Sequence, residues 1–86
     1  FDAVHLGEHH FSDYIVSAPQ MVLASVAEHT GKVKLSTGVT LLPHHDALRI
    51  AEDFATLDVL SNGRAEVVIG RGVFPHTYRH MGQDIE

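Results

Sequence analysis

The chain contains no cysteine, only six lysine and arginine residues among 86, and no long hydrophobic run. Without thiols it forms neither disulfides nor cysteine-based metal sites, although this does not indicate a cellular compartment. With a formal net charge of −5 and no basic cluster, it lacks the positive surface that dominates nucleic-acid binding, so neither DNA nor RNA is an expected partner. No apolar stretch approaches the ~20 residues that span a bilayer, and no leader pattern is present. We therefore expect a cytoplasmic protein that does not associate with membranes.

The composition is typical of a folded protein, since 44% of the residues are hydrophobic and 20% are charged. A domain of this length buries only ~60–65% of the surface that its unfolded chain exposes, so its stability on its own would be marginal. Phe1 leads almost directly into an apolar segment, as if a strand were entered midway. These features predict that the chain is part of a larger domain.

Three apolar segments rich in β-branched residues predict strands: Ala3–Leu6, one within Lys32–Leu42, and Ala65–Ile69. Gly38 lies inside the second, where a glycine usually marks a close backbone approach or a local distortion. Helical segments separate the strands and no hairpin signal joins them, so we expect β-α-β-α-β order, parallel strands and both helices on one side of the sheet. An open doubly wound sheet and a (β/α)8 barrel both fit this pattern.

The two helical segments carry signals at their ends. In the first, Ser17 is the expected N-cap, Pro19 falls in the first turn, and Gly31 is the expected left-handed residue after the helix. The second begins at an Asp46 cap and ends at Ser61-Asn62-Gly63.

Charged residues in and after the second helix are interpreted as structural. Arg49 and Asp53 are spaced to pair across one helical turn. Asp58 lies at the edge of the apolar stripe and needs a partner, for which Arg64 is a candidate.

Most polar residues suited to chemistry follow the carboxyl ends of the predicted strands. These are Glu8-His9-His10, His44-His45 and Gly70-Arg71-Gly72. In parallel α/β proteins ligands bind at this edge of the sheet. The connections at the other edge, residues 30–32 and 61–64, carry no comparable cluster. We therefore expect a catalytic face built from these three loops.

Each cluster admits more than one interpretation. Glu8-His9-His10 could serve acid–base chemistry, contribute to a metal site or be a solvated loop. A metal site shared with His44-His45 stays an alternative, but adjacent residues rarely ligate one ion together, so no metal ligand is assigned. Gly70-Arg71-Gly72 suits a phosphate, because guanidinium and approachable backbone amides both donate to anions; the alternative is a turn with a solvated cation. His5 and His29 are expected to be structural.

Three segments together resemble the bacterial luciferase-like flavin-dependent monooxygenases in identity, order and spacing. They are Glu8-His9-His10-Phe11, the stretch from Arg49–Asp53 through Leu57–Arg64, and Gly70-Arg71-Gly72. The resemblance covers nearly the whole chain and implies that residues 1–86 are a fragment of a single α/β domain, a (β/α)8 TIM barrel, roughly its second to fourth strands. The chain departs from the luciferases proper at Pro43–Asp46 and at Gly70, so neither light emission nor aldehyde specificity is implied.

The resemblance also implies roles for individual residues. His9 matches the catalytic histidine beside the flavin, and His10 matches its less universal catalytic neighbour. Gly38-Val39 falls where the family often places a non-proline cis peptide against the flavin ring, and Arg71 matches a residue that holds the flavin phosphate. The remaining residues expected to bind the cofactor are Glu8, Gly70 and Gly72.

The implied activity is oxidation of a small organic substrate with reduced FMN and molecular oxygen. The reduced flavin would come from a separate flavin reductase, and the parent protein would be a dimer or larger homo-oligomer. One alternative is a deazaflavin-dependent oxidoreductase that transfers hydride, which the absorbance spectrum of the bound cofactor would reveal. Another is a non-catalytic flavin-binding or association module, because open strand edges favour pairing.

Overall fold

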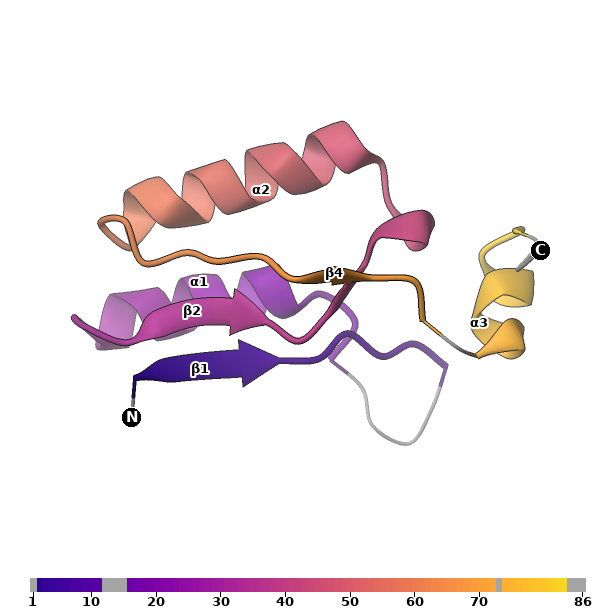
Figure 1. Ribbon diagram of the computed structural model, residues 1–86, viewed down its shortest axis with the longest axis horizontal. Coiled ribbons are helices and arrows are strands. Elements are labelled where there is room, and N and C mark those ends of the chain that lie inside the picture. The colour runs from indigo at the N-terminus through magenta and orange to yellow at the C-terminus, as the bar shows by residue number, and fades with distance from the viewer. Residues whose placement is uncertain (1, 12–15, 73, 84–86) are drawn as a thin grey trace.

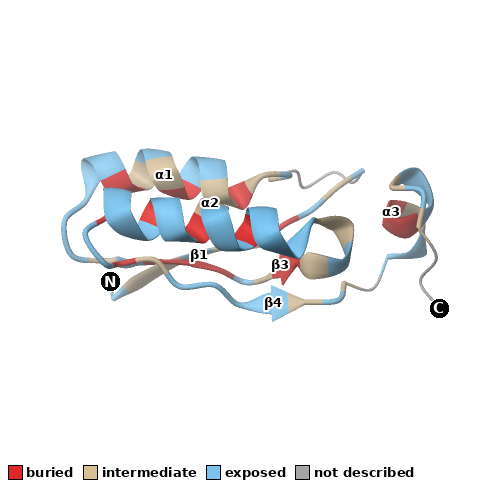
Figure 2. Cartoon of the chain, turned by 90° about the horizontal axis from the view of Figure 1, so that it is seen from above, coloured by how far each residue is buried: buried red, intermediate tan, exposed pale blue. Residues whose placement is uncertain are grey.

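The computed structural model describes residues 2–11, 16–72 and 74–83, in which parallel strands lie beneath two long helices (Figures 1 and 2). The strands are β1 (Ala3–Leu6), β2 (Lys34–Thr37), β3 (Thr40–Leu41) and β4 (Ile69–Gly70). The helices are α1 (Pro19–His29), α2 (Ala47–Leu60) and α3 (Pro75–His80), and a 3-10 turn, η1, covers Leu42–His44. Residues 12–15 of the loop expected after the first strand lie outside the described residues.

The strands are parallel and adjacent in chain order, as predicted. β1 pairs with β2 from Ala3–Lys34 to Leu6–Thr37, and β3 pairs with β4. A parallel bridge between Leu35 and Ala65 places the third chain segment beside the second. Figure 2 shows α1 and α2 side by side in one layer over the strands, so the expectation of both helices on one face is confirmed.

The apolar stripes of both helices and one strand form the core. Its buried members are Leu23, Ala27, Leu35, Ile50, Phe54 and Leu57. Burying a large apolar side chain stabilises a fold by roughly 1.5–3 kcal/mol, so this layer holds α1 and α2 on the sheet. In the last strand segment Val67 and Ile69 are exposed.

The second and third predicted strands are shorter than expected. The segment Lys32–Leu42 is divided into β2 and β3 at Gly38-Val39, whose peptide bond is cis. Within Ala65–Ile69, regular strand pairing is confined to its last residue and Gly70, apart from the bridge at Ala65. The Thr37 hydroxyl takes the place of backbone groups here, since it donates to the Val68 carbonyl at 3.1 Å and accepts from the Val68 amide at 3.2 Å.

The expected ends of α1 were wrong in detail. Ala18, not Ser17, occupies the N-cap position and makes no side-chain capping bond, whereas Pro19 opens the helix as predicted. At the other end Thr30 has extended backbone, so Gly31 is not the left-handed C-terminal residue. The helix ends without a left-handed turn because the Thr30 hydroxyl donates to the Val26 carbonyl at 2.8 Å and so supplies a partner for a carbonyl in the last turn.

The ends of α2 match the prediction. The Asp46 carboxylate accepts from the Leu48 amide at 2.9 Å, which is an N-cap bond worth about 1 kcal/mol. After the helix, Asn62 and Gly63 both have positive φ, 58° and 85°, and turn the chain toward the sheet.

Both predicted ion pairs were wrong. Arg49 lies 3.5 Å from Glu52, one position nearer than Asp53, and the Asp53 carboxylate instead accepts from Gln20 on α1 at 3.2 Å. Asp58 accepts the backbone amide of Ala65 at 3.1 Å. The Arg64 side chain turns toward the end of α1 instead and donates to the backbone carbonyls of Ala27 and Thr30.

The helix α3 was not predicted from the sequence. Six residues are too few to show a helical period, and Pro75 at the first position was the available signal. The buried Tyr78 donates its hydroxyl to the Arg71 carbonyl at 2.5 Å, which fixes α3 against the segment that follows β4. None of the helices in the described ranges is long and apolar enough to cross a membrane.

Candidate functional site

Residues that follow the strand ends line one pocket of about 180 Å³. The lining consists of Gly7, Glu8, His9, Gly38, Val39, Leu41, His44, Gly72, Phe74 and Thr77. Ligand pockets of complete proteins usually measure ~300–1,000 Å³, so these residues form part of a wall rather than a closed cavity. The pocket lies at the edge of the sheet where the sequence predicts the catalytic face.

The strand pairing continues into the loops and places the site. After β1, the Glu8 amide donates to the Val39 carbonyl at 3.3 Å, and the Gly38 amide donates to the Leu6 carbonyl at 2.9 Å. The loop that carries His9 therefore runs beside the Gly38-Val39 peptide, and both line the pocket.

The last predicted segment divides between two hollows. Gly72 lines the pocket with His9, whereas Gly70 and Arg71 line a second hollow together with Leu42, Pro43 and Ile69. The two hollows are lined by residues adjacent in the chain, since Leu41 and Gly72 belong to the first and Leu42 and Arg71 to the second. The structure thus brings His9 and Gly38-Val39 together in one pocket and places Arg71 in the neighbouring hollow.

Two glycines are needed for close backbone packing at this edge. A Cβ atom on Gly70 would lie 2.5 Å from Val39 Cγ2, so a side chain there would displace the residue that lines the pocket. Gly72 has a φ of +78°, which side-chain-bearing residues rarely adopt. Gly70 therefore lets β4 lie close to Val39, and Gly72 lets the chain after β4 turn beside Leu41.

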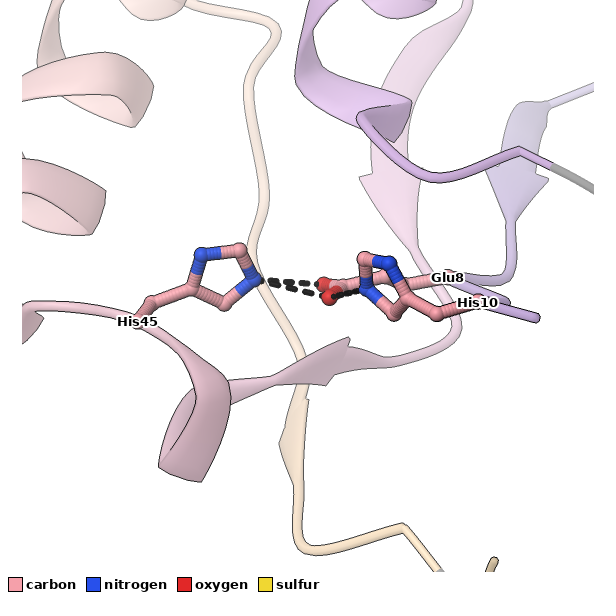
Figure 3. Close-up of side chains that lie close together, drawn as sticks. All are labelled: Glu8, His10 and His45. Atoms are coloured by element: carbon pink, nitrogen blue, oxygen red, sulfur yellow. Dashed lines mark hydrogen bonds and ion pairs between the residues drawn. The ribbon is translucent and has the colours of Figure 1, made fainter. Parts of the chain in front are cut away.

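Glu8 is the most strongly bonded polar residue near the pocket. Its side chain has no exposed surface, and it lies between the imidazoles of His10 and His45 (Figure 3). His10 Nε2 donates to Oε2 at 2.5 Å, His45 Nε2 lies 2.9 and 2.8 Å from the two oxygens, and the Leu41 amide donates to Oε1 at 3.0 Å. One carboxylate thus joins the loop after β1, strand β3 and the loop before α2.

Among the described residues, the same three side chains form the group that could hold a metal ion. Their potential ligand atoms all lie within 4.8 Å of one another, and they include one member of each histidine pair. Both imidazole nitrogens point at the carboxylate oxygens as hydrogen-bond donors would. The contacts are therefore explained by hydrogen bonding alone, and no metal ligand is assigned.

His44 is a pocket residue that the sequence analysis noticed but did not assign to the site. It lines the pocket, its ring meets Tyr78 edge-on at 4.5 Å, and its Nδ1 lies 2.6 Å from Gln83 Oε1. Phe74 and Thr77, also in the lining, belong to the segment around α3 that was not predicted. By contrast, His5 and His29 lie outside the pocket, and His29 donates to the Ser25 carbonyl at 2.9 Å, which fits the structural interpretation.

Parallel strands with helices on one face, and a pocket of histidine and glycine residues at their carboxyl ends, define the class as an α/β protein with an enzyme-like site. The family model described as luciferase-like monooxygenase matches residues 1–86. The chain belongs to this family, which confirms the resemblance.

Individual relatives agree with the family. The chain is 38% identical to limonene 1,2-monooxygenase of Rhodococcus erythropolis over 92% of its own length and 21% of the relative's. It superposes on the monooxygenase RslO1 from Streptomyces bottropensis with a TM-score of 0.93 and 32% identity, over 98% of this chain and 26% of that one. A Type II Baeyer–Villiger monooxygenase from Pseudomonas putida, solved in complex with FMN, gives a TM-score of 0.87 at 26% identity over 94% of this chain and 22% of that one. The chain therefore spans about a quarter of the length of these relatives.

Proposed function

We propose that the complete protein is a flavin-dependent monooxygenase that oxidises a small organic substrate with reduced FMN and molecular oxygen. The observation that carries the proposal is the shared pocket of His9 and the Gly38-Val39 backbone at the carboxyl ends of parallel strands. The similarity to a monooxygenase solved with FMN supports the choice of cofactor. We further propose that the complete protein is a (β/α)8 barrel in the cytoplasm, forms a dimer or larger homo-oligomer, and receives reduced flavin from a separate reductase.

The residues present fit a flavin. Glycines at positions 7, 38 and 72 leave backbone open along the pocket, where a planar ring needs close approach. The wall is largely apolar, since Val39, Leu41 and Phe74 contribute to it. In the neighbouring hollow, Arg71 offers paired guanidinium donors suited to a phosphate group.

Each residue has a defined task in this proposal. When bound in reduced form, FMN supplies the electrons with which oxygen is activated. His9 accepts and returns a proton through its imidazole, since histidine is the side chain that most often serves in general acid–base catalysis. The apolar wall excludes water from the reacting centre, and Arg71 holds the phosphate end in place.

Titration of the complete protein with FMN and with a deazaflavin cofactor tests the proposal. We expect FMN to bind with a change in its absorbance and fluorescence, and the reduced complex to consume oxygen with formation of an oxygenated product. Binding of deazaflavin alone, with hydride transfer and no oxygen consumption, would establish the alternative oxidoreductase. Failure to bind either cofactor would leave the protein as a non-catalytic module.

A further inference from the structure

His44 occupies an unusual position among the histidines at this edge of the sheet. It lines the pocket, yet it comes from the loop between β3 and α2 rather than from the loop that carries His9. The next residue, His45, is hydrogen-bonded to the buried Glu8, and Nδ1 of His44 is hydrogen-bonded to Gln83. The ring is thus fixed in place through both its chain neighbour and its own nitrogen.

The hydrogen bonds of Gln83 determine which atom faces His44. The two ends of a glutamine amide differ only in that one donates and the other accepts. The Pro43 carbonyl can only accept, and Gln83 Nε2 donates to it at 2.5 Å. The Gln83 oxygen must therefore be the atom that lies 2.6 Å from His44 Nδ1.

This orientation fixes the tautomer of the imidazole. Because the Gln83 oxygen is an acceptor, Nδ1 of His44 must carry a hydrogen and donate it. In a neutral imidazole the other nitrogen then has a lone pair and accepts. In the neutral ring, Nε2 of His44 therefore accepts a hydrogen bond and has no hydrogen to donate.

We propose that His44 is a second functional histidine of the pocket, whose Nε2 accepts a hydrogen bond from an N–H or O–H group of the bound flavin or substrate. Gln83 is its positioning residue, and the Pro43 carbonyl sets the orientation of Gln83. Such an acceptor favours pocket occupants that present a donor and disfavours equivalents without one. The inference rests on the proposed function for the identity of the occupant, but the tautomer is a property of the protein alone.

The tautomer is measured by long-range proton–nitrogen correlation NMR on the complete protein labelled with nitrogen-15, without cofactor, with His44→Phe to assign the signal. We expect the neutral His44 ring to carry its hydrogen on Nδ1. Gln83→Leu should release this preference, whereas the matched control Gln20→Leu, whose amide bonds Asp53 on the helix layer, should leave the His44 signal unchanged. A hydrogen on Nε2 in the parent protein would overturn the proposal.

Affinity and turnover then identify the donor. If a flavin N–H is the donor, we expect His44→Phe to weaken the binding of reduced FMN roughly 5–100-fold, because the N–H group would be left without an acceptor in the pocket. If the affinity is unchanged, turnover of an alkanal, a monoterpene or a thioether should fall by a similar factor, and His29→Phe serves as the control for losing an exposed histidine. Should His44→Phe change neither, the proposal is wrong. If the parent protein turns over none of these probes, the tautomer and FMN affinity decide the role of His44, whereas failure of the parent protein to bind FMN would overturn the proposed function and leave the tautomer as the test of His44.

Discussion

Arg64 is a buried cation that bonds to neutral acceptors. It is 9% exposed, and the described residues offer it no carboxylate partner. All five of its N–H donors are used instead: Nε with the Ser61 carbonyl, Nη1 with Thr30 Oγ1 and the Val33 carbonyl, and Nη2 with the Ala27 and Thr30 carbonyls. A cation beside the C-terminal carbonyls of α1 is also favoured by the helix dipole. Arg64 therefore joins the end of α1, the residue that precedes β2 and the turn after α2.

We expect Arg64→Met to destabilise the complete protein by about 2–4 kcal/mol, because several buried carbonyls would lose their donors. Arg64→Lys should cost less, since an ammonium offers three donors from one atom. The control is Arg49→Met, whose exposed 3.5 Å pair with Glu52 contributes under about 0.5 kcal/mol. Urea denaturation of the three variants measures the effect, and equal losses for Arg64→Met and Arg49→Met would contradict it.

His9 and Arg71 are expected to affect different steps of the proposed reaction. A contact to phosphate is present before and during the reaction, so Arg71→Ala should weaken FMN binding by about 1.5–3 kcal/mol without slowing the saturated enzyme. A proton-transfer group acts while charge moves, so His9→Ala should slow the oxygen-dependent step by roughly 10²–10⁴-fold at nearly unchanged affinity. Fluorescence titration and single-turnover kinetics at saturating FMN separate the two. The assigned roles would be reversed by loss of FMN from His9→Ala with normal saturated turnover.

At the scale of elements, the second predicted strand shows how side chains replace a backbone ladder. Where β2 gives way to β3, Thr37 Oγ1 donates to the Val68 carbonyl and accepts from the Val68 amide. It also accepts from the Thr40 hydroxyl at 3.0 Å, so its one hydrogen and two lone pairs are all used. This buried hydroxyl keeps the third chain segment beside the second across the interruption.

We expect Thr37→Val, which keeps the shape and removes the hydroxyl, to destabilise the complete protein by about 1–3 kcal/mol, because the Val68 amide would lose its acceptor, while the Val68 carbonyl would keep only its bond from the Thr40 amide. Amide exchange of Val68 should accelerate. Thr56→Val is the matched control, since its hydroxyl bonds the Glu52 carbonyl on the exposed face of α2 and its loss should change stability by less than about 0.5 kcal/mol. Unchanged protection of Val68 in Thr37→Val would show that the ladder does not need the hydroxyl.

The elements differ in how well their sequence predicted them. The centres of α1 and α2 followed from apolar spacing, and the Asp46 cap was correct because an N-cap bond spans only two residues. Ser17 and Gly31 were assigned to caps by residue type, but the actual end of α1 depends on Thr30 and on Arg64, which is far away in sequence. Element ends are settled by such distant bonds, which a local pattern does not contain.

At the scale of the whole molecule, the last strand segment remains largely uncovered. Val67, Val68 and Ile69 are 45%, 45% and 56% exposed, and because successive side chains of a strand point to opposite faces, this segment lacks cover on both faces. Parallel sheets are ordinarily covered on both faces. Because the chain spans about a quarter of its relatives, the missing cover is expected from the rest of a barrel.

Ile69→Asp in the complete protein tests this expectation. If the barrel encloses this position, an unpaired charge would be buried, and we expect a loss of about 3–5 kcal/mol or a failure to fold. Val59→Asp, on α2 and 82% exposed, should cost less than about 1 kcal/mol. Thermal denaturation compares the two, and a small loss for both would mean that the complete protein leaves this position open.

Local information in the chain was sufficient for the alternation of strands and helices, the parallel order, and the edge of the sheet at which His9 lies, whereas the assignment of Gly38-Val39 to the site came from the resemblance to the family. These features depend on periodicity and on the handedness of crossovers, which nearest neighbours along the chain encode. The bonds of Glu8 to His45, of Arg64 to Ala27 and of His44 to Gln83 join residues 37, 37 and 39 positions apart. Their formation depends on how the helices pack on the sheet, because a side chain meets its partner only after both elements are in place. Packing, rather than residue type, therefore decided that Glu8 is bonded to His45 and that His44 is bonded to Gln83, although both residues line the same pocket.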